Sequence, residues 1–177
     1  MRNCEAGKGL GRIGPKEDKD LTNAEKIIFL CVEKKRTIST AESMTAGGVG
    51  VGLTRVPGAS RVYVGGVITY TRALKQMLLG IPDSICERGM VTAEITLEMA
   101  KRVREKFNTY YGVAVTGNAG PTSDAGSASV GRVYFAAVDV TGREAIQECD
   151  YFGSRDMVRA KAVTDCLRFL RNFVEKE

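Results

Sequence analysis

The chain has 177 residues, of which 44% are hydrophobic, and its formal net charge is +5. This length is typical of one domain, and this apolar content is enough for a full core, which excludes global disorder. The chain contains no histidine, which excludes Ser-His-Asp and Cys-His triads and removes the commonest zinc ligand.

The cysteines are widely spaced, odd in number and without any Cys-x-x-Cys pair, lying at Cys4, Cys31, Cys86, Cys149 and Cys166. This pattern argues against a disulfide framework and against a zinc site. We therefore expect no bound metal and a reducing, cytoplasmic environment.

No apolar run approaches the ~18 residues that a membrane span needs. Basic residues are not interleaved with aromatic ones as in nucleic-acid-binding surfaces. Neither a membrane nor a nucleic acid is therefore expected as a partner. Residues 1–20 lack the apolar segment of a secretory signal and are predicted to form a flexible extension, whereas residues 21–177 are predicted to form one domain.

The first predicted elements follow from local sequence signals. Thr22 and Glu25 match a capping box, which opens a helix that runs to about Lys35. The β-branched residues 37–41 predict a strand, and an apolar helical stretch follows it. Residues 62–70 predict a second strand, in which two consecutive glycines indicate a bulge or a close backbone approach.

The later elements complete an alternating pattern. They are a short helix over 73–79, a helix from 93 to 107 capped by Thr92, a strand over 111–116, a hairpin of 132–140 with 144–152, and a final amphipathic helix capped by Ser154. Helices and strands alternate before the hairpin, which predicts an α/β fold of three layers, with a mixed sheet between helices. Ligands in such folds bind beyond the carboxyl ends of the strands.

A first polar cluster follows the strand at 37–41. Ser43 stands there, with Thr45, Ala46 and Gly47 leading into the next helix. A serine at a strand-to-helix turn can present its hydroxyl beside free backbone N–H groups, which stabilise an anion or oxyanion. Taken alone, the same pattern is also that of an ordinary helix cap.

A second cluster, after the strand at 62–70, contains Tyr70, Arg72 and Lys75. A lysine near a reactive serine acts as a base if burial or a neighbouring cation lowers its pKa, and Arg72 is a candidate for that cation. On its own, Lys75 also fits an exposed helix face.

A third cluster follows the strand at 111–116. Thr116, Gly117 and Asn118 stand there, and glycine at a strand end lets the backbone approach a ligand closely. Arg155, at the start of the last helix, adds a guanidinium to a helix N-terminus, which suits a phosphate monoester.

These clusters, in this order, resemble one known family. The stretches that carry the resemblance are 40–48, 56–60, 65–70 with Lys75, 79–82, 114–121, 130–134 and 152–155. They look like the C-terminal domain of the competence-damage-inducible protein CinA, and the resemblance covers about Ala24 to Phe173. The stand-alone form of that family is nicotinamide-nucleotide amidase, which hydrolyses nicotinamide mononucleotide to nicotinate mononucleotide and ammonia without a cofactor.

The resemblance also implies roles for individual residues. Because the family is similar to Ser-Lys amidases, Ser43 would be the nucleophile, Lys75 the base and Tyr70 a proton relay or positioning group. Thr116 would add a hydroxyl to the site, and Arg155 would hold the 5′-phosphate. Ser43 Oγ and Lys75 Nζ should then lie within hydrogen-bond reach, with Tyr70 and Thr116 in the same cleft.

The remaining site contacts are our own inference from the turns. The amides near Thr45 and Ala46 are expected to form the oxyanion hole, and Gly47, Gly117 and Asn118 are expected to contact the substrate. Similar domains tend to associate, so we also expect a homo-oligomer.

The chain departs from the family's usual motifs at several positions. Met44 and Ala46 stand in a motif that usually reads Glu-Ser-Cys-Thr-Gly-Gly, Arg72 and Ala73 replace an Asn-Glu pair, and Ser154 replaces an aspartate. These departures motivate a second hypothesis, a non-catalytic pyridine-nucleotide-binding module of the same fold. A nucleotide phosphohydrolase is a third hypothesis, although the sequence shows no clear carboxylate cluster for Mg²⁺.

Overall fold

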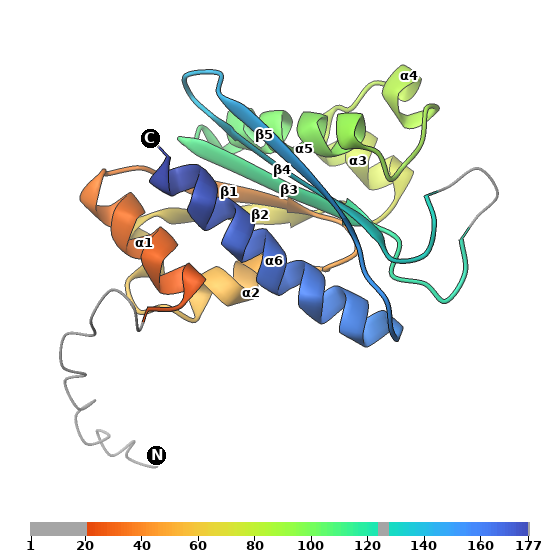
Figure 1. Ribbon diagram of the computed structural model, residues 1–177. Helices are drawn as coiled ribbons and strands as arrows, with labels where there is room; N and C mark the ends of the chain where they lie inside the picture. The colour runs from red at the N-terminus through yellow and green to blue at the C-terminus, as the bar shows by residue number, and fades with distance from the viewer. Residues whose placement is uncertain (1–20, 124–127, 177) are drawn as a thin grey trace, which may run out of the picture.

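The computed structural model describes residues 21–123 and 128–176, which form a mixed five-stranded sheet between two layers of helices (Figure 1). The strands lie in the order β2-β1-β3-β4-β5 and are β1 (Ile38–Glu42), β2 (Tyr63–Ile68), β3 (Tyr111–Gly117), β4 (Arg132–Asp139) and β5 (Glu144–Asp150). Strand β1 runs parallel to β2 and β3, whereas β4 is antiparallel to both β3 and β5. The predicted α/β fold with a mixed sheet is confirmed. The predicted extension of residues 1–20 lies outside the described residues.

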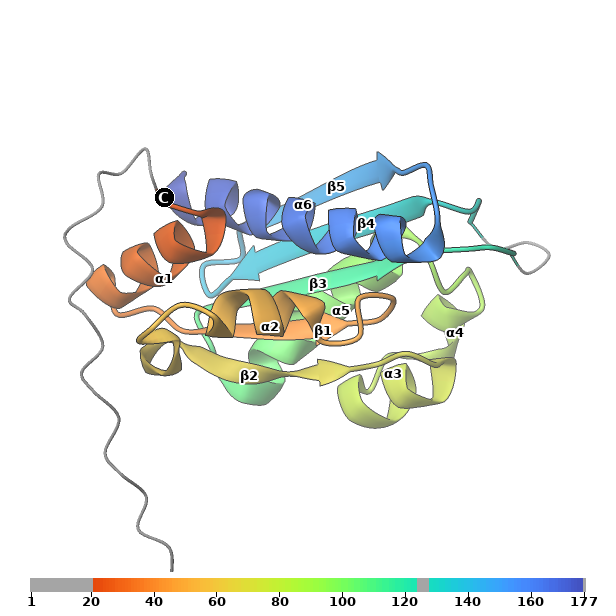
Figure 2. The same cartoon turned by 90° about the horizontal axis from the view of Figure 1, so that it is seen from below.

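The helices divide between the two faces of the sheet (Figure 2). One face carries α1 (Asn23–Glu33), α2 (Gly48–Thr54) and α6 (Arg155–Glu175), while the other carries α3 (Arg72–Leu79), α4 (Asp83–Cys86) and α5 (Ala93–Phe107). Each face has its own core. Ile27, Leu53 and Leu170 belong to the first, and Met99 and Val103 to the second.

The helix starts lie where the sequence signals place them. Thr22 and Glu25 form the expected capping box, and the Thr92 and Ser154 side chains each accept a hydrogen bond from a backbone N–H three residues ahead. Such caps satisfy N–H groups that have no partner inside the helix. The short helix α4 was not predicted, because one helical turn carries no apolar periodicity to detect.

The two glycines in β2 mark an irregularity in the sheet. The register between β1 and β2 shifts between Ile38 and Ser39, which pair with Tyr63 and Gly65. A Cβ on Gly66 would lie 2.0 Å from the Thr40 hydroxyl oxygen. The close backbone approach that the glycines predicted is present at Gly66, and the register shift agrees with the alternative prediction of a bulge. Burial alternates regularly along β2.

The strand order positions a binding site. The chain leaves β1 to form β2 on one side and later returns to form β3 on the other side of β1. Open α/β sheets bind ligands at such a reversal, in the crevice beyond the carboxyl ends of the strands. Ser43 follows β1 directly and Asn118 follows β3. Within the described residues, no helix is long and apolar enough to cross a membrane.

Candidate active site

A cavity of about 490 Å³ lies at this reversal of strand order. Its walls come from the turn after β1, the segment between β2 and α3, the first turn of α3, the loop before α5, the loop after β3 and the N-terminus of α6. The predicted site residues that line it are Ser43, Tyr70, Lys75, Gly117, Asn118 and Arg155. Segments distant in the sequence therefore meet where ligands bind in this class of fold.

Ser43 and Lys75 are in contact inside this cavity. Lys75 Nζ lies 3.3 Å from Ser43 Oγ and donates a second hydrogen bond, of 2.7 Å, to the carbonyl of Thr69. The lysine side chain is almost completely buried, with 1% exposed. Burial disfavours the charged amine and lowers the pKa of Lys75 from 10.5 to about 8. A substantial fraction of this amine is neutral near physiological pH and can accept a proton from the serine.

Arg72 does not have the role that the sequence suggested. Its guanidinium lies against Asp83, with Nη2 and Oδ1 2.5 Å apart, and both side chains are exposed. The pKa of Lys75 is lowered by burial and not by a neighbouring cation. This part of the prediction is corrected because the Asp83 carboxylate offsets the positive charge of Arg72.

Glu42 occupies the N-terminus of α2 from within the chain. Its buried carboxylate accepts hydrogen bonds from the Thr45 hydroxyl (2.6 Å) and from the amides of Gly47 (3.0 Å), Val49 (3.0 Å) and Gly50 (2.9 Å). An anion is favoured at this position by the free N–H groups and by the helix dipole. The anion site that the turn predicted therefore exists, but the chain's own carboxylate fills it.

The expected substrate contacts of the Ala46 and Gly47 amides are therefore corrected, because both have acceptors within the chain, whereas the contact expected of the Thr45 amide stays a prediction. None of them lines the cavity, and the Ala46 amide donates to the Ser43 carbonyl at 3.1 Å. Ala46 also adopts a left-handed backbone, with φ of 51°. The Met44 amide is different, because it belongs to a cavity-lining residue next to Ser43 and has no acceptor among the described residues.

Tyr70 and Arg155 meet at the rim of the cavity. Arg155 donates from Nη2 to the Tyr70 hydroxyl (2.6 Å) and from Nη1 to the Gly120 carbonyl (2.7 Å). The Tyr70 hydroxyl is thus hydrogen-bonded to Arg155 and, among the described residues, to neither Ser43 nor Lys75, which suits positioning better than proton relay. Among residues 21–123 and 128–176, no carboxylate lies within ion-pair distance of Arg155.

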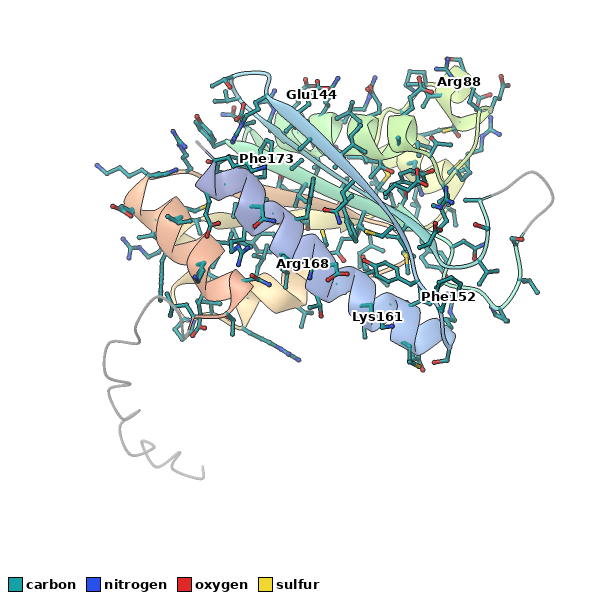
Figure 3. The ribbon with its side chains drawn as sticks, viewed as in Figure 1. Arg88, Glu144, Phe152, Lys161, Arg168 and Phe173 are labelled. Carbon is teal, nitrogen blue, oxygen red and sulfur yellow. The ribbon has the colours of Figure 1, made fainter. Side chains whose placement is uncertain are left out.

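Arg155 directly follows the turn that joins β5 to α6. Phe152 marks this turn and is 84% exposed (Figure 3). The Ser154 side chain caps α6, so Arg155 is the first residue of a 21-residue helix. The positive end of the helix dipole and the guanidinium lie together at this rim.

The residues around the end of β3 have different roles. Thr116 is fully buried, does not line the cavity and shares a 2.7 Å hydrogen bond with Thr96 on α5. The expectation that its hydroxyl lies in the cleft is therefore corrected.

Gly117 lines the cavity wall, where a Cβ would come within 2.5 Å of Met44 Sδ. The Asn118 side chain accepts from the Gly120 amide (3.0 Å) and donates to the Ala128 carbonyl (3.1 Å), which shapes the loop.

Sequence reasoning missed several supporting residues. Arg159 donates from Nε to the Met44 carbonyl at 3.0 Å and so holds the turn that carries Ser43. Its spacing of four residues from Arg155 puts both on one helix face, which is the signal that could have revealed it. Met90 and Val91 contribute apolar side chains to the cavity wall, and no motif indicated them. The acidic Glu42 before a glycine-rich helix start was a readable signal for an internal anion.

The fold and the cavity define an α/β domain with a buried lysine beside a serine at the reversal of strand order. A model of the CinA C-terminal domain family matches residues 20–174. The chain therefore belongs to the CinA C-terminal domain family, as its motifs suggested.

Relatives and solved structures agree with this membership. A CinA-like protein of Prochlorococcus marinus (strain NATL2A) is 42% identical over 118 residues, which cover 66% of this chain and 27% of that protein. A CinA-like protein of Cyanothece sp. (strain PCC 7425 / ATCC 29141) is 36% identical over 166 residues, which cover 92% of this chain and 39% of that protein. The chain thus spans less than half the length of these relatives.

Two crystal structures of similar chains have the same fold. The competence/damage inducible protein CihA from Agrobacterium tumefaciens is 31% identical with a TM-score of 0.79, over 84% of this chain and 91% of that one. The competence or damage-inducible protein from Enterobacter asburiae is 27% identical with a TM-score of 0.81, over 88% and 99% of the two chains. The likeness covers nearly all of both solved chains.

Proposed function

We propose that this chain is an amidohydrolase that converts nicotinamide mononucleotide to nicotinate mononucleotide and ammonia. The observation that carries the proposal is the 3.3 Å contact between Ser43 Oγ and the buried amine of Lys75, whose pKa is about 8. A serine becomes a nucleophile when a neighbouring base takes its proton, and no histidine is present to serve as that base. Membership of the CinA C-terminal domain family supports the same chemistry.

The proposed reaction proceeds through an acyl-enzyme. The neutral amine of Lys75 takes the Ser43 proton while Oγ bonds to the carboxamide carbon, and negative charge develops on the carboxamide oxygen. The free Met44 amide is the proposed donor to that oxygen. The protonated Lys75 then gives its proton to the departing nitrogen, which leaves as ammonia. Lys75 next takes a proton from water as the water oxygen bonds to the ester carbon. The bond between that carbon and Oγ then breaks, Lys75 returns the proton to Oγ, and the acid is released as its carboxylate.

The rim suits the phosphate of the proposed substrate. Arg155 lies at the N-terminus of α6 and lines the cavity that contains Ser43. In the part of the chain that the structure describes, no carboxylate forms an ion pair with it. A guanidinium and a helix N-terminus both favour phosphate oxygens. The cavity volume of about 490 Å³ is within the usual range for small-molecule sites. A lower rate with nicotinamide riboside than with the mononucleotide would support this role of Arg155.

The test is release of ammonia from nicotinamide mononucleotide by the purified chain. We expect Ser43→Ala to reduce the rate by several orders of magnitude, because removal of a nucleophile commonly has that effect. Ser60→Ala is the matched control, since Ser60 is exposed and lies in the short 3-10 helix Ala59–Arg61 outside the cavity wall. An unchanged rate in Ser43→Ala refutes the mechanism.

One observation favours the second hypothesis, nucleotide binding without turnover. Arg72 lines the cavity where the family's usual motif has an Asn-Glu pair, and it is held by Asp83. This hypothesis predicts heat of binding in calorimetry with no ammonia above the Ser43→Ala background, so measured turnover would exclude it. Nothing in residues 21–123 and 128–176 favours the phosphohydrolase, since these residues hold no cluster of three metal-ligating side chains.

A further inference from the structure

The hydroxyl of Thr69 is an anomaly next to the candidate active site. Thr69 is fully buried, and its Oγ1 has no hydrogen-bond partner among the described residues. Buried hydroxyls nearly always have a partner, because leaving one unpaired destabilises the fold. We therefore expect the Thr69 hydroxyl to have a hydrogen-bond partner in another protonation state of the site.

The sheet places Thr69 beside Ser43. The Thr69 amide donates to the Glu42 carbonyl at 2.7 Å, so the pairing of β2 with β1 continues past the end of β2. Val67 and Ala41 both pack in the core beside α5. Side chains alternate along a strand, so Thr69 and Ser43, each two residues further along, belong to that same face. Lys75 reaches this face from α3.

The amine of Lys75 has too few acceptors for its charged form. In the structure Nζ donates to the Thr69 carbonyl at 2.7 Å and to Ser43 Oγ at 3.3 Å, and no other acceptor for Nζ is found among the described residues. A neutral amine has two N–H donors, whereas the ammonium form has three. When Lys75 takes the Ser43 proton, a further donor appears in a buried place.

We propose that the Thr69 hydroxyl is the acceptor that Lys75 uses while it is protonated. The inference rests on the proposed function, since it concerns the same base. A rotation about the Cα–Cβ bond of Thr69 moves Oγ1 while the Thr69 carbonyl keeps its hold on Nζ. The proton itself passes only from Ser43 to Lys75, and Thr69 keeps its own hydrogen. Thr69 is thus a positioning residue that acts through Lys75.

The direct test is an NMR titration of Lys75 in protein labelled with ¹³C at the lysine Cε. Lys75→Met identifies the Lys75 signal by its loss. A hydrogen bond to the ammonium form raises the pKa of an amine, so Thr69→Val lowers the measured pKa of Lys75, by about one unit. Thr69→Ser retains the hydroxyl and returns the pKa toward the wild-type value. An unchanged pKa in Thr69→Val overturns the inference.

Stability and kinetics give a second pair of readouts. At about pH 9.5, above the pKa of Lys75, the amine is neutral and the Thr69 hydroxyl is unpaired, so Thr69→Val melts about 2–4 °C higher than the wild type. Its kcat falls by about tenfold while KM is unchanged, because Thr69 does not line the cavity. The control is Thr40→Val, since the Thr40 hydroxyl is paired with the Tyr63 hydroxyl at 2.8 Å. This variant melts at a lower temperature and keeps the wild-type pKa of Lys75. A lower melting temperature of Thr69→Val at about pH 9.5, where Lys75 is neutral, assigns Thr69 a structural role and overturns the inference.

These measurements separate the two proposals. If the wild-type chain releases no ammonia but Thr69→Val shifts the pKa of Lys75, the proposed function fails and the contact between Thr69 and Lys75 stands. If ammonia is released and the pKa of Lys75 is the same in both proteins, the inference about Thr69 fails by itself.

Discussion

Two buried charged side chains, Glu42 and Lys75, lie on opposite faces of the sheet near the end of β1. They are 2% and 1% exposed. The Glu42 carboxylate accepts hydrogen bonds from four donors around the start of α2. The Lys75 amine finds only two acceptors among the described residues, and one of them is the Ser43 hydroxyl.

The difference separates structure from reactivity. A buried charge with all its hydrogen-bonding capacity used makes its surroundings rigid. A buried charge with few partners destabilises the fold. The pKa of such a group moves toward neutrality, so a larger fraction of it is neutral. Glu42 therefore holds the turn in place, while Lys75 is ready to exchange a proton with Ser43.

The largest expected effect concerns Lys75 itself. Lys75→Met should reduce ammonia release by about 10³-fold, because it removes the general base, and it should not lower the free energy of unfolding at neutral pH. Lys101→Met is the control. Lys101 pairs with Glu144 at 2.7 Å, and Glu144 lies at the end of the β4–β5 hairpin away from Phe152 (Figure 3). Ammonia assays and urea denaturation check both statements. A strongly destabilised Lys75→Met would remove the contrast with Glu42.

The next effect is on the other side of the comparison. Glu42→Gln should lower the free energy of unfolding by about 3 kcal/mol, because a side-chain amide would set an N–H donor against backbone donors. Glu94→Gln is the control, since Glu94 is exposed and, within residues 21–123 and 128–176, forms its one ion pair with exposed Arg88 at 2.6 Å. Urea denaturation measures both variants. Equal stability of the Glu42→Gln variant and the wild type would show that the carboxylate does not organise the turn.

The pH dependence of stability sharpens the contrast. The pKa of Lys75 is about 8 in the fold and 10.5 without burial, so between these values the unfolded chain binds more protons and stability rises with pH. Below about pH 8 both states are protonated and the fold bears the full cost of the buried charge. Relative to Lys75→Met, the wild type should gain about 2 kcal/mol between about pH 8 and 9.5. Denaturation of both proteins across this pH range checks whether stability rises with pH. A constant difference between their free energies of unfolding would contradict the prediction.

The smallest expected effect is at the turn that Glu42 organises. Ala46 has φ of 51°, a left-handed conformation that is unfavourable for residues with a Cβ. Ala46→Gly should raise the free energy of unfolding by about 0.5–1 kcal/mol, after the extra freedom of glycine in the unfolded chain is subtracted. Ala160→Gly, on the exposed face of α6, should instead lower it by about 1 kcal/mol. Denaturation midpoints of both variants measure these changes. A lower free energy of unfolding in Ala46→Gly would show that the backbone at Ala46 is not strained.

Much of the site was within reach of the sequence, with instructive exceptions. The ordered motifs indicated the family, and Ser43, Lys75 and Arg155 all line one cavity. Thr45, Ala46 and Gly47 were assigned to the substrate, but the Thr45 hydroxyl and the Gly47 amide donate to Glu42, and the Ala46 amide donates to the Ser43 carbonyl. A motif shows which residue types lie together along the chain, and does not show which of two faces each side chain joins.

The sequence by itself determined the strands through their runs of β-branched and apolar residues. It also determined the starts of the helices with side-chain caps such as Thr22 and Ser154, because such a cap acts on a residue three positions away. Only the tertiary structure decided the partners of Tyr70 and Thr116 and the burial of Lys75. The Arg155 guanidinium that meets Tyr70 comes from 85 residues further along the chain. The burial that lowers the pKa of Lys75 comes from packing of α3 against its neighbours. Local hydrogen bonds are encoded in short stretches, whereas desolvation and side-chain pairing depend on contacts that exist only once the whole sheet has formed.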